Sequence, residues 1–244
     1  QTCALPILRG LKNEAVIVAD ATCTAVQKFK KKLRWRETEK WFDCGGIGIL
    51  AYAAVSNEVH VVKELLKVLK RDFNGEEYTK RLESRLRDDG YTSLGIPGGT
   101  TTLMAAMMTA SPEVVSMLLE SGANVESVDV MGQDGFMLAS AFGRAKNMQC
   151  WLEKVKDWDL NRQNTVLGGS ALGNAVYMGA NKLETVKLLL NAGALLDFRN
   201  FSGGNALTGA VSNEDSDPDV VRVVLQKIKE SFGVKEFRSE EHTS

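Results

Sequence analysis

The sequence predicts an all-α protein made of stacked helix-turn-helix units with β-turn tips. The first observation is that glycine, a bulky apolar residue and alanine recur five times at one fixed spacing: Gly46-Leu50-Ala53, Gly99-Leu103-Ala106, Gly132-Phe136-Ala139, Gly168-Leu172-Ala175 and Gly203-Leu207-Ala210. The second is that an apolar helical stretch follows each triplet, at residues 61–66, 114–119, 147–152, 186–190 and 220–225. Two short helices cannot bury both of their apolar faces alone, so each unit needs neighbours.

The stretch from residue 99 to residue 125 contains one complete unit. A first helix is predicted from Thr101 to Thr109, where small alanines allow close packing. Ser111 is predicted to cap a second helix with Pro112 at its first position. Gly122 is predicted to end that helix, because a residue with positive φ is needed there.

This pattern resembles the ankyrin repeat. The bulky apolar residues of successive triplets are separated by 53, 33, 36 and 35 residues, close to the ankyrin period of about 33 apart from one long interval. The resemblance covers about five repeats, residues 43–232, and implies an ankyrin-repeat solenoid. No unit keeps the Pro or the His of the family's Thr-Pro-Leu-His start, which implies a less regular stack.

The two ends of the chain are predicted to be foreign to the protein. Residues 1–7 (QTCALPI) and 238–244 (RSEEHTS) are what the two strands of a short-read sequencing adapter encode. Residues 8–237 are then an internal fragment of a longer reading frame. Within it we expect a helical extension or degenerate repeat at 8–42, the repeat domain at 43–232, and a truncated continuation at 233–237.

Composition excludes several classes of function. Without the terminal heptapeptides the chain has 29 basic and 29 acidic residues, so its net charge gives no general attraction to nucleic acid. The cysteines that remain, Cys23, Cys44 and Cys150, form neither a disulfide framework nor a zinc spacing. No apolar run is long enough to span a membrane. We therefore expect a monomeric, cytoplasmic or otherwise intracellular chain with no metal and no cofactor.

One basic segment offers a weak route to nucleic acid or to phospholipid. The stretch from Lys28 to Arg36 contains six basic residues and no acid. It is read either as a patch for an acidic partner or RNA, or as the solvated face of a helix whose apolar residues pack inward. The second reading is favoured, because Glu37 and Glu39 follow directly and offset the charge.

The long interval contains an insertion at residues 70–96. A charged amphipathic helix is predicted from Glu76 to Arg87, with Tyr78, Leu82 and Leu86 on one stripe. Insertions in repeat arrays project from one face and can join a binding site. The alternative is a lengthened loop whose three apolar residues pack back on the array, and the sequence does not separate the two.

No catalytic constellation is present in the sequence. The glycines at 45–48 lack the strand and the Lys-Ser/Thr that a phosphate-binding loop needs, and they fit a repeat turn better. His60 has no second His or Cys near it, so it is expected at the surface or half-buried. Cys150 is expected to be a buried structural thiol. An enzyme is therefore not predicted.

The ankyrin resemblance implies where a partner would bind. In that family the turn tips act as fingers and the first helices as a palm, and apolar residues at these positions suit an interface. The candidate partner-binding residues are Met108, Thr109, Val130, Met131, Gln133, Phe142, Val166, Leu167, Tyr177, Met178, Phe201 and Ser202. The alternative is that the irregular tips fold these side chains inward.

The resulting hypothesis is a non-catalytic protein-protein interaction module that binds a protein partner through its concave face and turn tips. The alternative is a substrate-recognition segment of a larger enzyme or channel whose active domain lies outside this fragment, because ankyrin arrays often serve as the recognition part of longer chains. Fold alone names neither the partner nor the pathway.

Overall fold

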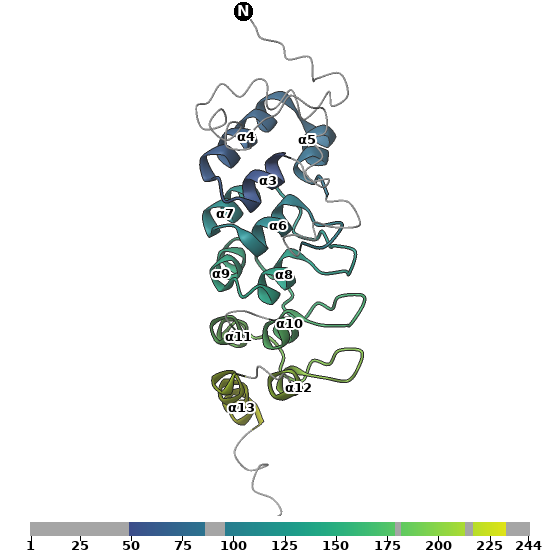
Figure 1. Cartoon of the computed structure of the whole chain (residues 1–244), viewed down its shortest axis with the longest axis vertical. Helices are drawn as coiled ribbons and strands as arrows, with labels where there is room; N and C mark the ends of the chain where they lie inside the picture. The colour runs from purple at the N-terminus through teal and green to yellow at the C-terminus, as the bar shows by residue number, and fades with distance from the viewer. Residues whose placement is uncertain (1–48, 86–95, 179–181, 213–216, 233–244) are drawn as a thin grey trace, which may run out of the picture. The chain divides into compact units, whose positions relative to one another are not determined.

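The computed structural model describes residues 49–85, 96–178, 182–212 and 217–232. The two terminal heptapeptides, the extension at 8–42 with its basic segment, the first turn at 43–48 and the continuation at 233–237 lie outside the described residues. The chain divides into two compact units, Gln1–Gly135 and Phe136–Ser244, which we call unit 1 and unit 2 and describe separately (Figure 1).

The described part of unit 1 consists of two helical hairpins and one inserted helix. The helices are α3 (Ile49–Val55), α4 (Val59–Asp72), α5 (Gly75–Leu82), α6 (Thr102–Thr109) and α7 (Pro112–Glu120). The first helices α3 and α6 pack against each other, and the second helices α4 and α7 do the same, so the hairpins stack in two layers. The inserted helix α5 contacts α4.

Unit 2 repeats this arrangement. Its helices are α8 (Gly135–Ala141), α9 (Ala145–Lys154), α10 (Ala171–Met178), α11 (Lys182–Asn191), α12 (Ala206–Ser212) and α13 (Pro218–Phe232). The first residue of α8, Gly135, belongs to unit 1. Helix α10 packs on α12, and α11 packs on both α9 and α13. In Figure 1 the turns before α10 and α12 project to the same side of these helices. The predicted all-α, stacked-hairpin class is thereby confirmed.

The recurring triplet marks equivalent positions of the core. Its bulky apolar residue is the second residue of α3, α6, α8, α10 and α12, and it is buried in the first four of them and half-buried at Leu207. The alanine that follows three residues later is at most 3% exposed in all five helices. Alanine is required there because neighbouring helices approach closely and leave no space for a larger side chain.

The glycine of the triplet is required by the backbone of the turn. Gly99, Gly132, Gly168 and Gly203 all have positive φ, between 66° and 81°. At Gly168 the space is closed as well, because a Cβ atom would lie 2.4 Å from Cδ1 of Phe201. Any other residue there would be strained and would displace the ring.

An Asp or Asn holds each described turn of the later repeats. Oδ1 of Asp129 accepts hydrogen bonds from the N–H groups of Met131 and Gln133, and Oδ1 of Asn200 accepts them from Ser202 and Gly204. Asn164 does the same for Leu167. These side chains satisfy backbone donors that the turn would otherwise leave open.

Two local predictions are wrong in detail. Helix α7 begins at Pro112 as predicted, but the Ser111 side chain does not cap it; the Ser111 N–H instead donates to Oδ1 of Asn57, 2.8 Å away. The inserted helix ends at Leu82 rather than at Arg87. It ends early because the residues after it hydrogen-bond to the neighbouring turns, as described below.

Candidate partner-binding surface

Unit 2 exposes apolar side chains at the C-terminal ends of its first helices. Tyr177 and Met178 end α10 and are 53% and 64% exposed, and Val211 near the end of α12 is similarly exposed. A Cβ on Gly209 would lie 3.0 Å from Cδ2 of Tyr177, so one edge of the ring rests against α12. We call Tyr177, Met178 and Val211 the helix-end cluster.

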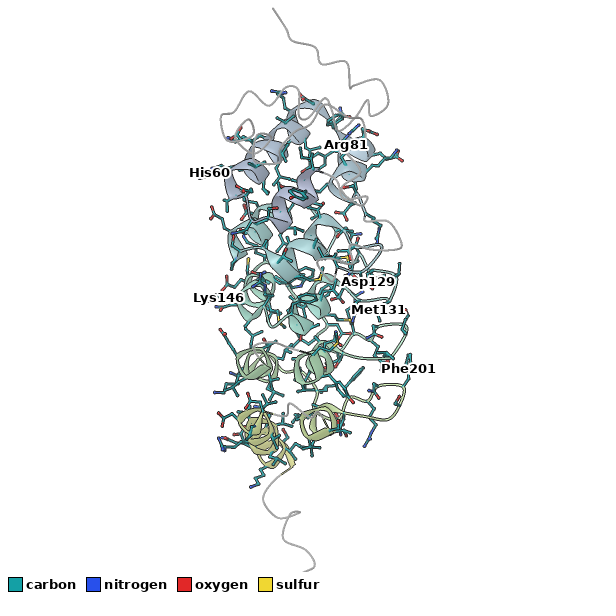
Figure 2. The ribbon with its side chains drawn as sticks, viewed as in Figure 1. His60, Arg81, Asp129, Met131, Lys146 and Phe201 are labelled. Atoms are coloured by element: carbon teal, nitrogen blue, oxygen red, sulfur yellow. The ribbon has the colours of Figure 1, made fainter. Side chains whose placement is uncertain are left out.

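A second group lies on the turns of unit 2. Val166 and Leu167 lie on one turn, and Phe201, which is 66% exposed, lies on the next (Figure 2). The two turns are adjacent, because the Phe201 N–H donates to the Leu167 carbonyl oxygen at 3.0 Å. Ser202 beside them is also exposed. We call Val166, Leu167 and Phe201 the turn cluster.

Phe201 has a structural role in addition to its exposure. One face of its ring packs on Gly168 of the preceding turn. Val130 occupies the same repeat position in unit 1 and packs on Gly99 in the same way, with Cγ1 3.3 Å from the place of a Cβ. Each of these side chains therefore packs on the preceding turn with part of its surface, while Val130 remains 53% and Phe201 66% exposed.

Two residues predicted for the surface are buried in unit 1. Met108 is 1% exposed, because seven of the eight residues of α6 are buried and the helix has no solvent-facing side. Gln133 is 7% exposed, because its N–H and its carbonyl oxygen both bond to Asp129 at the base of the turn. Both are therefore removed from the candidate surface.

The remaining predicted residues are intermediate. Thr109 is half-buried and donates its hydroxyl to the Ala105 carbonyl oxygen. Met131, on the turn in Figure 2, is also half-buried, as is Phe142 after α8. Among the five predicted residues of unit 1, only Val130 is strongly exposed.

A nitrogen donor fastens successive turns, and sequence reasoning did not find it. In unit 2, Nε2 of Gln163 donates to the carbonyl oxygens of Gly168 in its own turn and Arg199 in the next, each at 3.0 Å. In unit 1, Nη1 of Arg85 donates to the corresponding oxygens of Gly99 and Val128, at 2.7 and 2.6 Å. Arg85 comes from the insertion, so only the three-dimensional structure places it in this role.

The insertion packs back on unit 1. Leu82 is buried, and the Tyr78 hydroxyl donates to the Ser121 carbonyl oxygen at 2.7 Å. Oε1 of Glu83 accepts the Asn124 N–H, and Oε2 accepts the Ser127 hydroxyl. Arg81 lies over the Phe73 ring and pairs with Glu77. Tyr78 and Leu82 of the predicted stripe thus pack on the array, as the second reading expected, although from a helix instead of a loop. Leu86 lies outside the described residues.

Two carboxyl groups of unit 1 have raised pKa values. Burial raises the pKa of Asp129, opposed by its hydrogen bonds from Gln133 and Met131, and Oδ2 of this residue is buried without a hydrogen-bond partner. Burial also raises the pKa of Glu83, opposed by Asn124, Ser127 and the charge of Arg85. In unit 2 the position of Asp129 is taken by Asn164 and Asn200. Their side-chain amides are neutral, so burying them does not require a charge to leave water.

Three further observations concern the described residues. They contain no group of three or more His, Cys, Asp or Glu side chains able to hold a metal ion. No helix within this part of the chain is both long and apolar enough to cross a membrane. Cys150 is buried as predicted, in the helix that also contains the fully buried Trp151, and His60 is exposed.

Stacked helical hairpins with glycine-dependent turns define a helical-repeat protein. Residues 98–130 match the family model described as ankyrin repeat, so the chain contains an ankyrin repeat, as the resemblance of its triplets implied. Ankyrin repeats are generally protein-protein interaction modules.

The chain is also similar in sequence to three curated proteins. The chain is 29% identical over 143 residues to Phosphocholine transferase AnkX of Legionella pneumophila subsp. pneumophila, which covers 58% of this chain and 14% of that protein. It is 32% identical over 158 residues to the Nuclear factor NF-kappa-B p105 subunit of Gallus gallus, covering 64% and 15%. It is 37% identical over 101 residues to Ankyrin repeat and SAM domain-containing protein 6 of Rattus norvegicus, covering 41% and 11%. The chain thus spans less than a sixth of each relative's length.

Proposed function

We propose that this chain is a protein-recognition module, and that the helix-end cluster and the turn cluster of unit 2 contact the partner. The observation that carries the proposal is the concentration of exposed large apolar side chains on first helices and turns. Scattered exposed apolar residues are normal, but six on adjacent elements of one unit are what a binding surface needs. The partner is expected to present apolar or aromatic side chains, since none of the six is charged.

Rigidity supports the same proposal. Tyr177 rests on Gly209, and Phe201 rests on Gly168. Aromatic side chains that are held in place before binding lose little conformational entropy on association. Met178 is 64% exposed, and its flexible side chain can adapt its shape to different partners. The surface therefore combines fixed anchors with one adaptable side chain.

A displayed library of random peptides tests the proposal. Binders are selected on the full chain, and their affinities are measured on Met178→Gln, Val211→Gln and Tyr177→Ser. We expect losses of tenfold or more for these variants, which is about 1.4 kcal/mol or more in binding free energy. Lys187→Gln, an exposed position on α11, is the matched control and should change nothing. Binders that are indifferent to the first three substitutions would refute the proposed surface.

A second candidate is favoured by one of the relatives. One of them is named a transferase, and the chain covers 14% of it. The module would then be the substrate-recognition segment of a larger enzyme. A full-length transcript that encodes a catalytic domain beside these repeats would support this candidate, whereas one that encodes repeats alone would oppose it.

A further inference from the structure

The chain contains a single Asn-Gly step, and it lies at the start of the inserted helix. Asn74 and Gly75 follow α4, which ends at Asp72, and Gly75 is the first residue of α5. Every other asparagine of the chain is followed by a residue with a Cβ atom. A backbone nitrogen reaches the preceding asparagine amide most easily when it belongs to glycine, because no Cβ atom hinders the approach. Asn74 is therefore chemically distinct from the other asparagines.

The structure leaves both reacting groups accessible. Asn74 and Gly75 are exposed, and the Asn74 side chain makes no capping hydrogen bond to α5. Among the described residues the Gly75 N–H donates no hydrogen bond. A Cβ atom on Gly75 would meet nothing within 4 Å, so this backbone has room to turn.

One backbone rotation brings the two groups together. Asn74 has an extended backbone, with φ −135° and ψ 165°, and turning about its Cα–C bond moves the Gly75 nitrogen towards Cγ of Asn74. A hydrogen bond from the Tyr78 N–H to the Asn74 carbonyl oxygen has to open for this rotation. Its length of 3.3 Å is beyond the ordinary range, so it opposes the rotation only weakly.

Other exposed or half-buried asparagines are held in place. Oδ1 of Asn200 accepts two N–H groups of its own turn. Asn191 at the end of α11 is exposed, but the N–H of the next residue, Ala192, donates to the Leu188 carbonyl oxygen at 2.9 Å. The nitrogen that would have to attack Asn191 is thus fixed in the helical hydrogen-bond pattern. Asn191 therefore serves as an internal comparison for Asn74.

We propose that Asn74-Gly75 is a self-modification site, at which the asparagine loses its amide through a cyclic imide. The Gly75 nitrogen forms a bond to Cγ of Asn74 and gives its proton to water, while the side-chain Cγ–N bond breaks and ammonia leaves. Water then opens the ring. Hydrolysis at Cγ leaves aspartate in the normal chain, whereas hydrolysis at the backbone carbonyl carbon leaves isoaspartate, whose chain runs through Cγ. Water is the only co-reactant, and nothing is oxidised or reduced.

The two products should affect the inserted helix differently. Aspartate keeps the backbone and places an anion at the N-terminal end of α5, where the partial positive charge of the helix favours it. Isoaspartate adds a carbon atom to the chain between α4 and α5. Leu82 is buried and the Tyr78 hydroxyl bonds to the Ser121 carbonyl oxygen, so the added length strains the attachment of α5. The isoaspartate form should therefore hold this helix less firmly.

Mass spectrometry of the full chain tests the proposal. The protein is incubated at neutral pH in water enriched in a heavy oxygen isotope and is then digested. The peptide that contains residues 74 and 75 should gain the heavy oxygen as aspartate and as isoaspartate, the latter identified by methyl transfer from S-adenosylmethionine by an isoaspartyl methyltransferase. The peptide that contains Asn191 should stay unchanged. Asn74→Gln should remove the reaction, because its longer side chain would have to close a larger ring.

The same measurement in urea tests the contribution of the fold. Because neither reacting group is held, the rate in the folded chain should lie within about tenfold of the rate in the unfolded chain. Hydrogen exchange of residues 76–82 should be faster in the separated isoaspartate form than in the parent protein. The Asn74→Asp variant, which has the same charge as the isoaspartate form but a normal backbone, should exchange no faster than the parent protein.

Four results would overturn the proposal. The first is a folded chain that reacts far more than about tenfold slower than the unfolded chain, because the fold would then protect this step. The second is aspartate without isoaspartate, because direct hydrolysis of the amide gives only the former. The third is an equal reaction at Asn191. The fourth is unchanged hydrogen exchange in the isoaspartate form, which would show that the modification does not reach α5.

Discussion

Unit 1 and unit 2 are built from the same repeat but differ in how much apolar surface they leave open. Of nine large apolar side chains that are exposed in the described residues, unit 1 contributes Val130 and unit 2 contributes the other eight. In unit 1 the insertion supplies Leu82, Tyr78 and Arg85 as additional contacts. In the described residues the repeat frame thus builds the core of both units, whereas the number of exposed large apolar side chains differs between them.

The units also differ in the charge that their turns bury. Unit 1 buries the carboxylate of Asp129, while unit 2 uses amides at the same position. Both fastening residues carry a nitrogen donor, but it is a cationic guanidinium in unit 1 and a neutral amide in unit 2. Substitutions at these positions therefore test whether the two units differ in stability for these reasons.

The largest effect is expected for Gly168→Ala in unit 2. The strain of positive φ and the collision with the Phe201 ring together should lower the free energy of unfolding by about 2–4 kcal/mol. Gly122→Ala in unit 1 is the matched control, because its φ is +84° but a Cβ there meets nothing within 4 Å. Urea denaturation should give a loss of only about 1 kcal/mol for the control. Equal losses would show that the ring contact contributes nothing.

Arg85→Ala should have the next largest effect, in unit 1. It removes two hydrogen bonds from a charged donor, so the free energy of unfolding should fall by about 1–3 kcal/mol. Arg85→Gln should lower the free energy of unfolding by less, because Gln163 makes the equivalent pair of hydrogen bonds in unit 2. Hydrogen exchange at residues 98–101 and 128–134 measures the effect locally. If the Gln and Ala variants lose the same free energy of unfolding, positions 85 and 163 are not equivalent.

Asp129→Asn should stabilise unit 1 at neutral pH by about 1 kcal/mol, because it replaces a buried carboxylate with a neutral amide. The folded state raises the pKa of Asp129, so its contribution to stability is present at acidic pH. That contribution is lost as the pH rises above about 4, the ordinary Asp value, and through the raised pKa. The free energy of unfolding, measured by urea denaturation from about pH 3 to about pH 7 so that the Asp titration is covered, should depend less on pH in the variant than in the parent protein.

Glu83 and Asp72 also have shifted pKa values, in the variant as in the parent protein. Glu83 acts in the same direction as Asp129, and Asp72, whose pKa is lowered by a hydrogen bond from Arg71, acts in the opposite one. Only the difference between variant and parent therefore reports on Asp129. The reciprocal substitution, Asn200→Asp in unit 2, should lower the free energy of unfolding at neutral pH, because it places a carboxylate where the chain has an amide. A stabilising Asn200→Asp would contradict the electrostatic explanation.

The smallest effect on folding is expected for Met178→Gln. This side chain is 64% exposed, so the free energy of unfolding should change by less than about 0.5 kcal/mol. The same variant is expected to lose peptide binding, which separates a binding role from a structural one. Thermal denaturation beside the affinity measurement checks this, and a marked loss of stability would place Met178 in the core instead.

The fold was predictable because its determinants are steric and local. Gly168, Leu172 and Ala175 each satisfy one requirement of the repeat: positive φ, a core side chain and close helix approach. Helix ends were less predictable where a distant group intervenes. Ser111 looks like a cap in the sequence, but its backbone N–H bonds to Asn57, 54 residues away.

The candidate surface was predicted only in part. Val166, Leu167, Tyr177, Met178 and Phe201 are exposed as expected, although their binding role stays a prediction. Met108 was wrongly placed at the surface, and the signal against it was present: α6 contains no charged residue.

Two features of the surface were not foreseen. Val211 was not among the predicted residues, although it is 56% exposed. Arg85 could not have been assigned from spacing, since the oxygen atoms that it binds lie 14 and 43 residues further along the chain.

The two hydrogen bonds of Gln163 make unit 2 sensitive to chemical ageing. Hydrolysis of this side-chain amide releases ammonia and leaves a carboxylate, which can only accept hydrogen bonds at neutral pH. The new anion would face the carbonyl oxygens of Gly168 and Arg199, to which the amide nitrogen had donated. This one hydrolysis would thus turn an attraction between neighbouring repeats into a repulsion.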